Sequence, residues 1–406
     1  MATPNKRISM HDAGRLQAFR AAALVIFTAF SISTLLGTPT TATPLDPNAF
    51  ISIGTLAGGA IAIDTDTLTV TGGGSGVVVA QGGAPLGQKS GGPSDIAVFT
   101  FDGGSVLGDV TITGSRAAAI LFQGAGQVTG SINVSGGSVS GTTAGALGAV
   151  GGGRGGSGEP FGVGIPNGFG IGGGTGGTTS SPISGGGPGS GGGFGTAGGV
   201  AGAGVTFVQG GIAYGDIVAQ LAGGSGGGGG GGHNGGVGGG GGAGGGALEI
   251  GALNDLILSG ATLIANGGDG GVPSSTPHGG GGGGSGGAIL LHGFNVSIDV
   301  TSMISANGGD GGSAGLFYTP VGSCGGAGQI AVLTNDSGTL TNNGQVESEA
   351  GHNGDGVACA LAFSPLYLTD PEIGQGTVVA MSAPASIAFF GIGLVGLGYA
   401  RRKRTA

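Results

Sequence analysis

Glycine dominates this chain and restricts what it can fold into. It supplies 110 of the 406 residues, mostly in runs between residues 145 and 328. Each glycine costs a helix about 1 kcal/mol relative to alanine, and no amphipathic stripe of 3.6-residue period compensates outside the chain ends. We therefore expect an all-β fold, with helices only at the two ends.

The segments between the glycine runs repeat at a step of 41 residues. Three copies of one motif carry the step: Gly-Ala-Leu-Glu-Ile at 246–250, Gly-Ala-Ile-Leu-Leu at 287–291 and Gly-Gln-Ile-Ala-Val at 328–332. The same step links Ile257 with Ile298 and Leu263 with Ile304. Self-similarity at a fixed period of this size is typical of stacked repeats.

Within a repeat, apolar residues alternate in steps of two, as in Leu248 and Ile250 and again in Leu256 and Leu258. Such alternation places each pair on one face of a strand. Three short strands in about twenty residues predict one coil of a right-handed parallel β-helix, a solenoid with long glycine-rich loops, whose coils stack about 4.8 Å apart.

The glycine-rich segments at 145–202, 223–246, 267–287 and 308–328 admit two interpretations. Glycine maximises the entropy of the free chain, which favours disorder. Alternatively, successive segments pack as extended polyproline II chains, where only glycine permits close backbone approach. The sequence leaves both open, and we expect residues 145–202 to be the looser part.

The N-terminal end has the layout of a signal peptide. Four basic residues, Lys6, Arg7, Arg15 and Arg20, precede an uncharged apolar run at 21–37, and Thr40-Thr41-Ala42 offers small residues to a signal peptidase. We expect residues 1–42 to be removed, with a retained N-terminal anchor as the alternative.

The C-terminal end combines a short polar motif, an apolar run and a basic cluster. These are Ala383, Pro384, Ala385 and Ser386, then residues 387–400, then Arg401, Arg402, Lys403 and Arg404. The layout is that of a tail that stops in a membrane with its positive end in the cytoplasm. A transmembrane helix here is short unless residues 383–386 also enter the bilayer.

This tail resembles the PEP-CTERM sorting signal of bacterial exported proteins, in a variant that reads Ala-Pro-Ala-Ser in place of Pro-Glu-Pro. The resemblance covers only the tail. It implies export, anchoring in the inner membrane by the C-terminal helix, and processing by an exosortase, usually in bacteria that make an extracellular polysaccharide matrix. An anchor that is never cut is the alternative.

These features divide the chain into six parts. We predict a signal peptide at 1–42, N-terminal β-helix rungs at 43–144, a low-complexity glycine segment at 145–203, the 41-residue repeats at 204–372, a linker at 373–382 and the sorting segment at 383–406.

The exported body is acidic. Between the targeting segments lie only three basic residues, Lys89, Arg116 and Arg154, against 19 acidic ones, a balance of −16. Binding a nucleic acid requires clustered Lys and Arg, so we expect no nucleic acid partner. An acidic surface suits solubility outside the cell, divalent cations or neutral sugars, and an extracellular polysaccharide is the partner we consider.

Two cysteines, Cys324 and Cys359, lie near the end of the body. In an oxidising compartment an isolated pair predicts a disulfide, and two unpaired thiols are the alternative. No Cys-x-x-Cys or histidine spacing accompanies them, so we expect no metal site there, and no motif in the chain indicates a cofactor.

Several Asn and Asp residues next to glycine are candidate calcium ligands. They are Asn266, Asp269, Asn307, Asp310, Asn353 and Asp355, which lack the strict nonapeptide spacing of calcium-binding repeats. We therefore favour turns with positive φ for them. Three histidines in glycine-rich segments, His233, His278 and His352, lack ligand spacing and are expected to face solvent.

We expect a non-enzymatic protein of the cell surface or extracellular matrix, with a structural or adhesive role in a biofilm. One alternative is a polysaccharide-cleaving enzyme on the same scaffold, using Asp64 and Asp66 as paired carboxylates on one strand face. A solvated strand edge is the simpler interpretation of that pair. The other alternative is an ice-binding protein, indicated by threonines that alternate along one strand at 65, 67, 69 and 71 but do not recur in later repeats.

Overall fold

The computed structural model describes residues 44–72, 87–89, 95–139, 144–160, 166–178, 186–203, 206–233, 235–274, 277–313, 321–335, 337–359 and 366–369. All of these belong to one unit, which begins at Pro44. Its one helix among the described residues is the 3-10 turn η1 (Pro47–Ala49). No helix in these ranges is both long enough and apolar enough to cross a membrane. The predicted signal peptide, linker and sorting segment lie outside the described residues.

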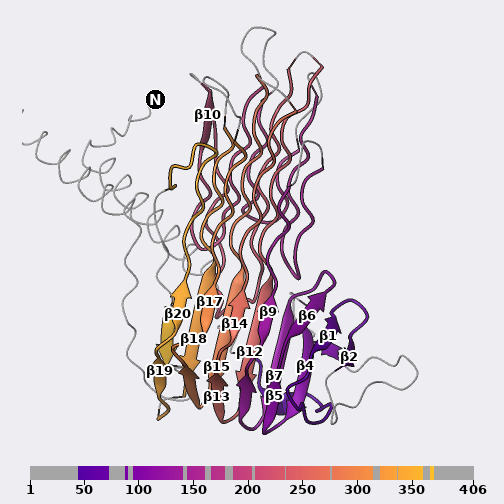
Figure 1. Cartoon of the computed structure of the whole chain (residues 1–406), viewed down its shortest axis with the longest axis vertical. Helices are drawn as coiled ribbons and strands as arrows, with labels where there is room; N and C mark the ends of the chain where they lie inside the picture. Colours follow the sequence, from indigo (N-terminus) through magenta and orange to yellow (C-terminus); the bar gives the residue numbers. More distant parts are fainter. Residues whose placement is uncertain are drawn as a thin grey trace, which may run out of the picture. The chain divides into compact units, whose positions relative to one another are not determined.

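Three sheets and one hairpin contain the strands (Figure 1). The first sheet has the order β2 (Thr69–Gly72), β1 (Ile61–Asp64), β6 (Val110–Thr113), β9 (Ser131–Asn133), β14 (Thr262–Ile264), β17 (Met303–Ser305) and β20 (Gln345–Glu347). The second has the order β21 (Leu366–Thr369), β18 (Gln329–Thr334), β15 (Ala288–Gly293), β12 (Ala247–Ala252), β7 (Ala118–Gln123), β4 (Ala97–Asp102) and β3 (Gln88–Lys89). The third has the order β19 (Leu340–Asn342), β16 (Asn295–Ile298), β13 (Asp255–Leu258), β8 (Gly126–Val128) and β5 (Ser105–Leu107). The hairpin joins β10 (Ala201–Ala203) to β11 (Thr206–Val208).

The 41-residue repeat is the register of strand pairing between β12, β15 and β18 in the second sheet and between β14 and β17 in the first. Leu248 in β12 pairs with Ile289 in β15, and Leu263 in β14 pairs with Ile304 in β17. These side chains are fully buried in a single cluster that also contains Leu256 and Leu258 of β13 and Val296 and Ile298 of β16. The predicted apolar core is therefore present, because each repeat adds the same inward-facing positions to it.

The pairing of β13 with β16 in the third sheet departs from that step by one residue. Ile257 pairs with Ser297, and Leu258 pairs with Ile298, at a step of 40. The prediction that Ile257 matches Ile298 is wrong. That register would place the buried side chains of Leu258 and Ile298 on opposite faces of the sheet. Ile257 is instead 39% exposed.

The glycine-rich segments form an ordered body of their own, which we call the glycine array. It comprises residues 134–139, 144–160, 166–178, 186–203, 206–212, 223–233, 236–246, 265–272, 278–287, 306–313, 321–328 and 348–355. Figure 1 shows these segments as extended chains that run on from the strands and lie beside one another. Most of their glycines are buried, so their backbone groups must find partners within the array.

Hydrogen bonds in the array recur at every third residue. Segment 223–231 donates to segment 239–245 through three N–H groups, with N–O distances of 2.8, 2.9 and 2.7 Å: Gly224 to Gly245, Gly227 to Gly242 and Gly230 to Gly239. The N–H groups between them reach other segments, as Gly226 does to Phe169 and Gly228 to Ser190. Three residues per turn without internal hydrogen bonds is the polyproline II arrangement. The ordered interpretation that the sequence left open therefore holds for these residues.

Close backbone approach explains why the array is made of glycine. A Cβ added at Gly284 would collide with the carbonyl of Ala243, and one at Gly325 would collide with the carbonyl of Gly284. Segment 151–159 is equally tight, since Gly153 and Gly156 donate to Gly224 and Gly227. The prediction that residues 145–202 pack loosely is wrong for the parts of that segment that the structure describes.

The predicted right-handed parallel β-helix with glycine-rich loops is also wrong. The first and second sheets are mixed, because β2 and β3 run antiparallel to their neighbours, and β10 and β11 form a separate antiparallel pair. The glycine-rich segments are not loops, since they pair with one another over most of their length. The predicted fold class treated these segments as loops outside stacked coils, whereas they form a body of polyproline II chains that satisfy their N–H groups between segments.

Candidate functional site

A row of polar side chains follows the 41-residue repeat along one side of the glycine array. The Asn266 Oδ1 accepts the backbone N–H of Asn307 at 2.8 Å, and the Asn307 Oδ1 accepts that of Glu349 at 2.8 Å. The Ser135 hydroxyl begins the row by accepting the Asn266 N–H at 3.2 Å. Each side chain thus holds the equivalent position of the next repeat.

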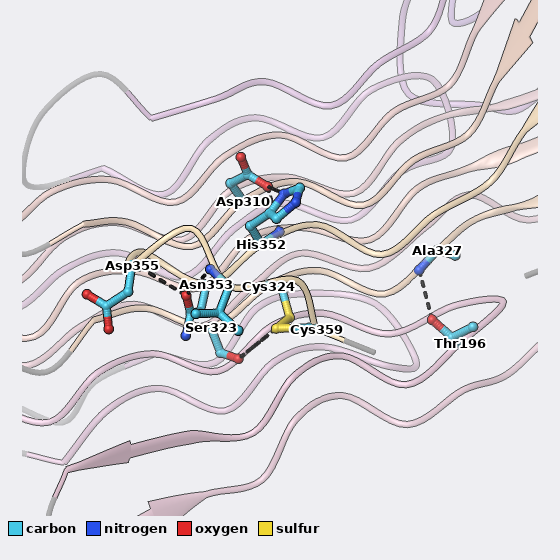
Figure 2. The surroundings of a disulfide bond; sticks show 10 residues. Thr196, Asp310, Ser323, Cys324, Ala327, His352, Asn353, Asp355 and Cys359 are labelled. Carbon is cyan, nitrogen blue, oxygen red and sulfur yellow. Dashed lines mark hydrogen bonds and ion pairs between the residues drawn. A yellow bond between two sulfur atoms is a disulfide. The ribbon is translucent and has the colours of Figure 1, made fainter. Parts of the chain in front are cut away.

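A second row lies three residues further along the same segments. The Asp269 Oδ1 accepts the N–H of Asp310 at 2.8 Å, and the Asp310 Oδ1 accepts the N–H of His352 at 2.6 Å. Figure 2 shows His352 beside Asp310, where its Nδ1 lies 3.1 Å from the same oxygen. We call the two rows the polar ladder. Asp269, Asp310 and His352 are exposed, so this surface is acidic and repetitive.

The polar ladder replaces the turns that the sequence predicted at these residues. None of the glycines beside Asn266, Asp269, Asn307 and Asp310 has a positive φ, so the turn prediction is wrong there. It is right for the third copy, where the Asn353 Oδ1 accepts two backbone N–H groups and Gly356 has φ +77°. Within the described ranges no three His, Cys, Asp or Glu residues gather as a metal site.

Cys324 and Cys359 are joined by a disulfide, with Cα atoms 6.2 Å apart. Figure 2 shows the bond beside Ser323, in the part of the array that also carries His352. A Cβ on Gly199 would lie 2.5 Å from the Cys324 Sγ and 3.1 Å from the Cys359 Sγ. The bond therefore ties the last repeat to the array and is itself covered by a further glycine segment.

The carboxylates of Asp64 and Asp66 each bind neighbouring groups of the protein. Asp64 ends β1, and its Oδ1 accepts the N–H groups of Asp66 and Thr67 at 2.9 Å each. The hydrogen bond from the Thr67 N–H is the main cause that lowers the Asp64 pKa. Asp66 instead accepts from Ser115 and contacts Arg116 at 3.4 Å. The expected placement of both acids on one strand face is wrong, because Asp66 lies in the turn after β1.

The four alternating threonines do not share a strand either. Thr65 and Thr67 lie in the turn between β1 and β2, whereas Thr69 and Thr71 belong to β2. Thr65 is buried and the Thr67 and Thr69 hydroxyls bond each other at 2.9 Å. The flat threonine row that ice binding would use is therefore not formed here.

A buried carboxylate that the sequence did not single out lies on the outer face of the second sheet. The Glu249 side chain is 2% exposed, and its Oε1 lies 3.0 Å from the His292 Nε2 and 2.8 Å from the Leu45 nitrogen. His292 stacks over Gly251, where a Cβ would collide with its ring. The alternation of apolar residues in the repeat did not predict this pair, because Glu249 and His292 lie where neighbouring repeats carry apolar residues.

Removing His292 should destabilise the fold by about 2 kcal/mol, since a buried carboxylate loses a charge-assisted partner. We expect His292→Leu to show this loss in urea unfolding followed by circular dichroism. His292→Gln is the control, because its amide N–H can take the place of the ring nitrogen. Equal stability of the two variants would contradict this role.

His233 and His278 are buried, so the prediction that they face solvent is wrong. The His233 backbone N–H donates to the His278 Nδ1 at 2.8 Å, which fixes the neutral tautomer with its proton on Nε2. Neither nitrogen of that tautomer offers a free lone pair, so His278 is a poor metal ligand. Burial lowers the pKa of His278, and the neighbouring His233 lowers it further.

This pair predicts a loss of stability in mild acid. The folded state resists protonating His278, so the unfolded chain takes up the extra proton as the pH falls below the ordinary value of 6.5. The loss ends once the pH is below the lowered folded pKa. His278→Asn keeps an acceptor near the Nδ1 position but cannot titrate. Comparing urea midpoints at pH 7.5 and 5.5 should show a smaller drop for the variant, and an identical drop would refute the assignment.

The sorting motif Ala383 to Ser386 and the basic tail Arg401 to Arg404 lie outside the described residues, as does the predicted signal peptide. His352, also expected in solvent, is exposed and belongs to the polar ladder.

No family model, curated protein or solved structure matches this chain. The geometry therefore has to define the candidate site by itself. It offers a glycine array that is hydrogen-bonded from segment to segment, with a repetitive acidic surface and a disulfide that ties the last repeat to the array.

Proposed function

We propose that this chain is an exported structural or adhesive protein of a bacterial cell surface or extracellular matrix, sorted by its PEP-CTERM-like tail. The polar ladder is the observation that carries the proposal. It presents equivalent side chains once per repeat on a backbone that is hydrogen-bonded from segment to segment. Such a surface can make many weak contacts at once, and multivalency turns these into firm attachment.

Two further features support a role outside the cell. The Cys324–Cys359 disulfide is stable in an oxidising compartment. The body carries few positive charges, and two of its three basic side chains, Lys89 and Arg116, are paired with Asp95 at 3.0 and 3.4 Å. A neutral extracellular polysaccharide is therefore the partner we favour, with an exosortase-type enzyme acting on the tail and the membrane as a transient anchor.

Mass spectrometry of the protein recovered from the cell surface and the medium tests the sorting step. We expect an N-terminus near residue 43 and loss of Arg401 to Arg404. Retention of that basic cluster in the mature protein would refute processing.

Deletion of the gene tests the role itself. We expect the deletion to reduce the mass of the matrix and the attachment of cells, and the wild-type chain to restore both. A variant that cannot form the glycine array, such as Gly284→Ala, should not restore them. Unchanged attachment after deletion, or cleavage of a purified glycan by the protein, would overturn the proposal.

A further inference from the structure

The stack of repeats has an open edge at its C-terminal end (Figure 1). β20 is the last strand of the first sheet and β19 is the last strand of the third, and the structure describes no further strand beside either of them. The second sheet continues by one more strand, because β21 pairs with β18 in parallel. The chain therefore begins a further repeat at residues 366–369 on one sheet only, as far as the structure describes it.

The apolar core is incompletely covered at this edge. Leu340 in β19 and Val346 in β20 pack against the core but are only partly buried. Their strand partners, Val296 and Ile304, are 1% and 0% exposed, because each has a neighbouring strand on both sides. Leu340 and Val346 lack the second neighbour among the described strands.

The backbone of β20 is open on the same side. The Gln345 N–H donates to Ser302 at 3.0 Å, and the Glu347 carbonyl accepts from Ala306 at 2.9 Å, so both residues turn their backbone groups toward β17. Because successive residues of a strand alternate in this direction, Val346 turns its N–H and its carbonyl outward. An edge of this kind is a template for another strand.

Charge at the edge disfavours a second copy of the chain as that strand. The last described repeat carries Glu347, Glu349 and Asp355 against a single histidine, His352, so two copies that met edge to edge would bring like charges together. Residues 373–382 of the same chain, by contrast, carry no charge, and they follow β21 after three residues.

The paired core positions recur at nearly constant intervals along each repeat. From Val332 the chain takes 8 residues to Leu340 and 14 to Val346. From Ile250 the equivalent intervals are 6 and 13 residues, and from Leu291 they are 5 and 13.

β21 sets the start of the next set of intervals. Tyr367 pairs with Val332, so the same intervals lead to residues 372–375 for the third sheet and 380–381 for the first. Ile373, Ala380 and Met381 supply apolar side chains at these places in the sequence. The chain beyond the described residues is therefore long enough, and suitably patterned, to reach both open strands.

We propose that residues 370–382 complete this repeat, with one strand beside β19 and one beside β20, and cover Leu340 and Val346. The added strands pair with open backbone groups and remove two half-exposed apolar side chains from water. The segment is then part of the folded body in place of the predicted linker, and the sorting motif begins where that body ends. This inference does not depend on the proposed matrix role.

Hydrogen exchange in the full exported chain tests the proposal. We expect the Leu340 and Val346 amides to exchange at least about 100-fold faster in Ile373→Asp than in the wild type, because a charge resists burial beside the core and frees the added strands. Thr377→Asp is the matched control, since it adds the same charge between the two expected strands and should leave the exchange unchanged. Equal rates in the wild type and Ile373→Asp would overturn the proposal.

Photo-crosslinking identifies what lies beside the edge. A benzoylphenylalanine at position 345, which is exposed in β20, should crosslink within the chain to residues 378–382, as mapped by mass spectrometry of the digested protein. Crosslinks only to a second copy or to another protein, or no crosslink to this segment, would contradict it.

Discussion

Replacing Gly284 with alanine is expected to lower the free energy of unfolding by more than about 4 kcal/mol, enough to unfold many domains. Gly284 donates to Gly268 and accepts from Gly309, and its missing Cβ is replaced in space by the carbonyl of Ala243. An added methyl group would push segment 278–287 of the glycine array away from segment 236–246. Chemical unfolding followed by circular dichroism measures the effect.

Gly137→Ala is the matched control within the same array. Gly137 is exposed, and its Cβ would lie 3.2 Å from the Leu147 carbonyl oxygen, which a small shift can accommodate. We expect a change below about 1 kcal/mol. If both variants unfolded at the same denaturant concentration, close packing of the array would not be what holds it together.

Loss of the Cys324–Cys359 disulfide is expected to cost about 3–4 kcal/mol, from the closure entropy of a loop with a sequence separation of 35. The double variant Cys324→Ala with Cys359→Ala should therefore unfold at a clearly lower denaturant concentration. A reducing agent should lower the stability of the wild type to the same level and leave the variant unchanged. A variant as stable as the oxidised wild type would show that the bond contributes nothing.

The core of the repeat could be predicted from the sequence because side-chain burial and strand register share one period. Leu248 and Leu263 were placed correctly, since a step of 41 residues aligns them with their partners. The one-residue offset at Ile257 was not predictable, because the turn between β12 and β13 absorbs it.

The glycine array was harder to predict because its signal is the absence of side chains. A run such as residues 223–232 has the same composition whether it is disordered or packed, and only the position of its neighbours decides which. The period of three appears in the hydrogen bonds, which the sequence does not display. The predicted fold class, a β-helix with glycine-rich loops, was wrong for this reason.

The hydrogen-bond partners of the site residues could not be predicted from the sequence either. The spacing of Asn266 and Asn307 places them in equivalent positions of the repeat, but their residue types indicate only calcium binding or turns. Their actual partners are backbone N–H groups one repeat away. Glu249 and His292 were not predicted as a pair, because they lie at outward-facing strand positions that are apolar in neighbouring repeats. Their contact with each other and with Leu45 appears only in the structure.

Hydrogen exchange of the backbone amides in residues 224–231 tests most directly whether the glycine array is a rigid body. The backbone N–H groups in this segment donate to neighbouring carbonyls or, at Ser225, to the Ser285 hydroxyl at 2.8 Å. We expect these amides to exchange as slowly as the amides of strand β12 and to lose protection in the same unfolding transition. Exchange at the rate of an unstructured chain, while β12 stays protected, would contradict this expectation.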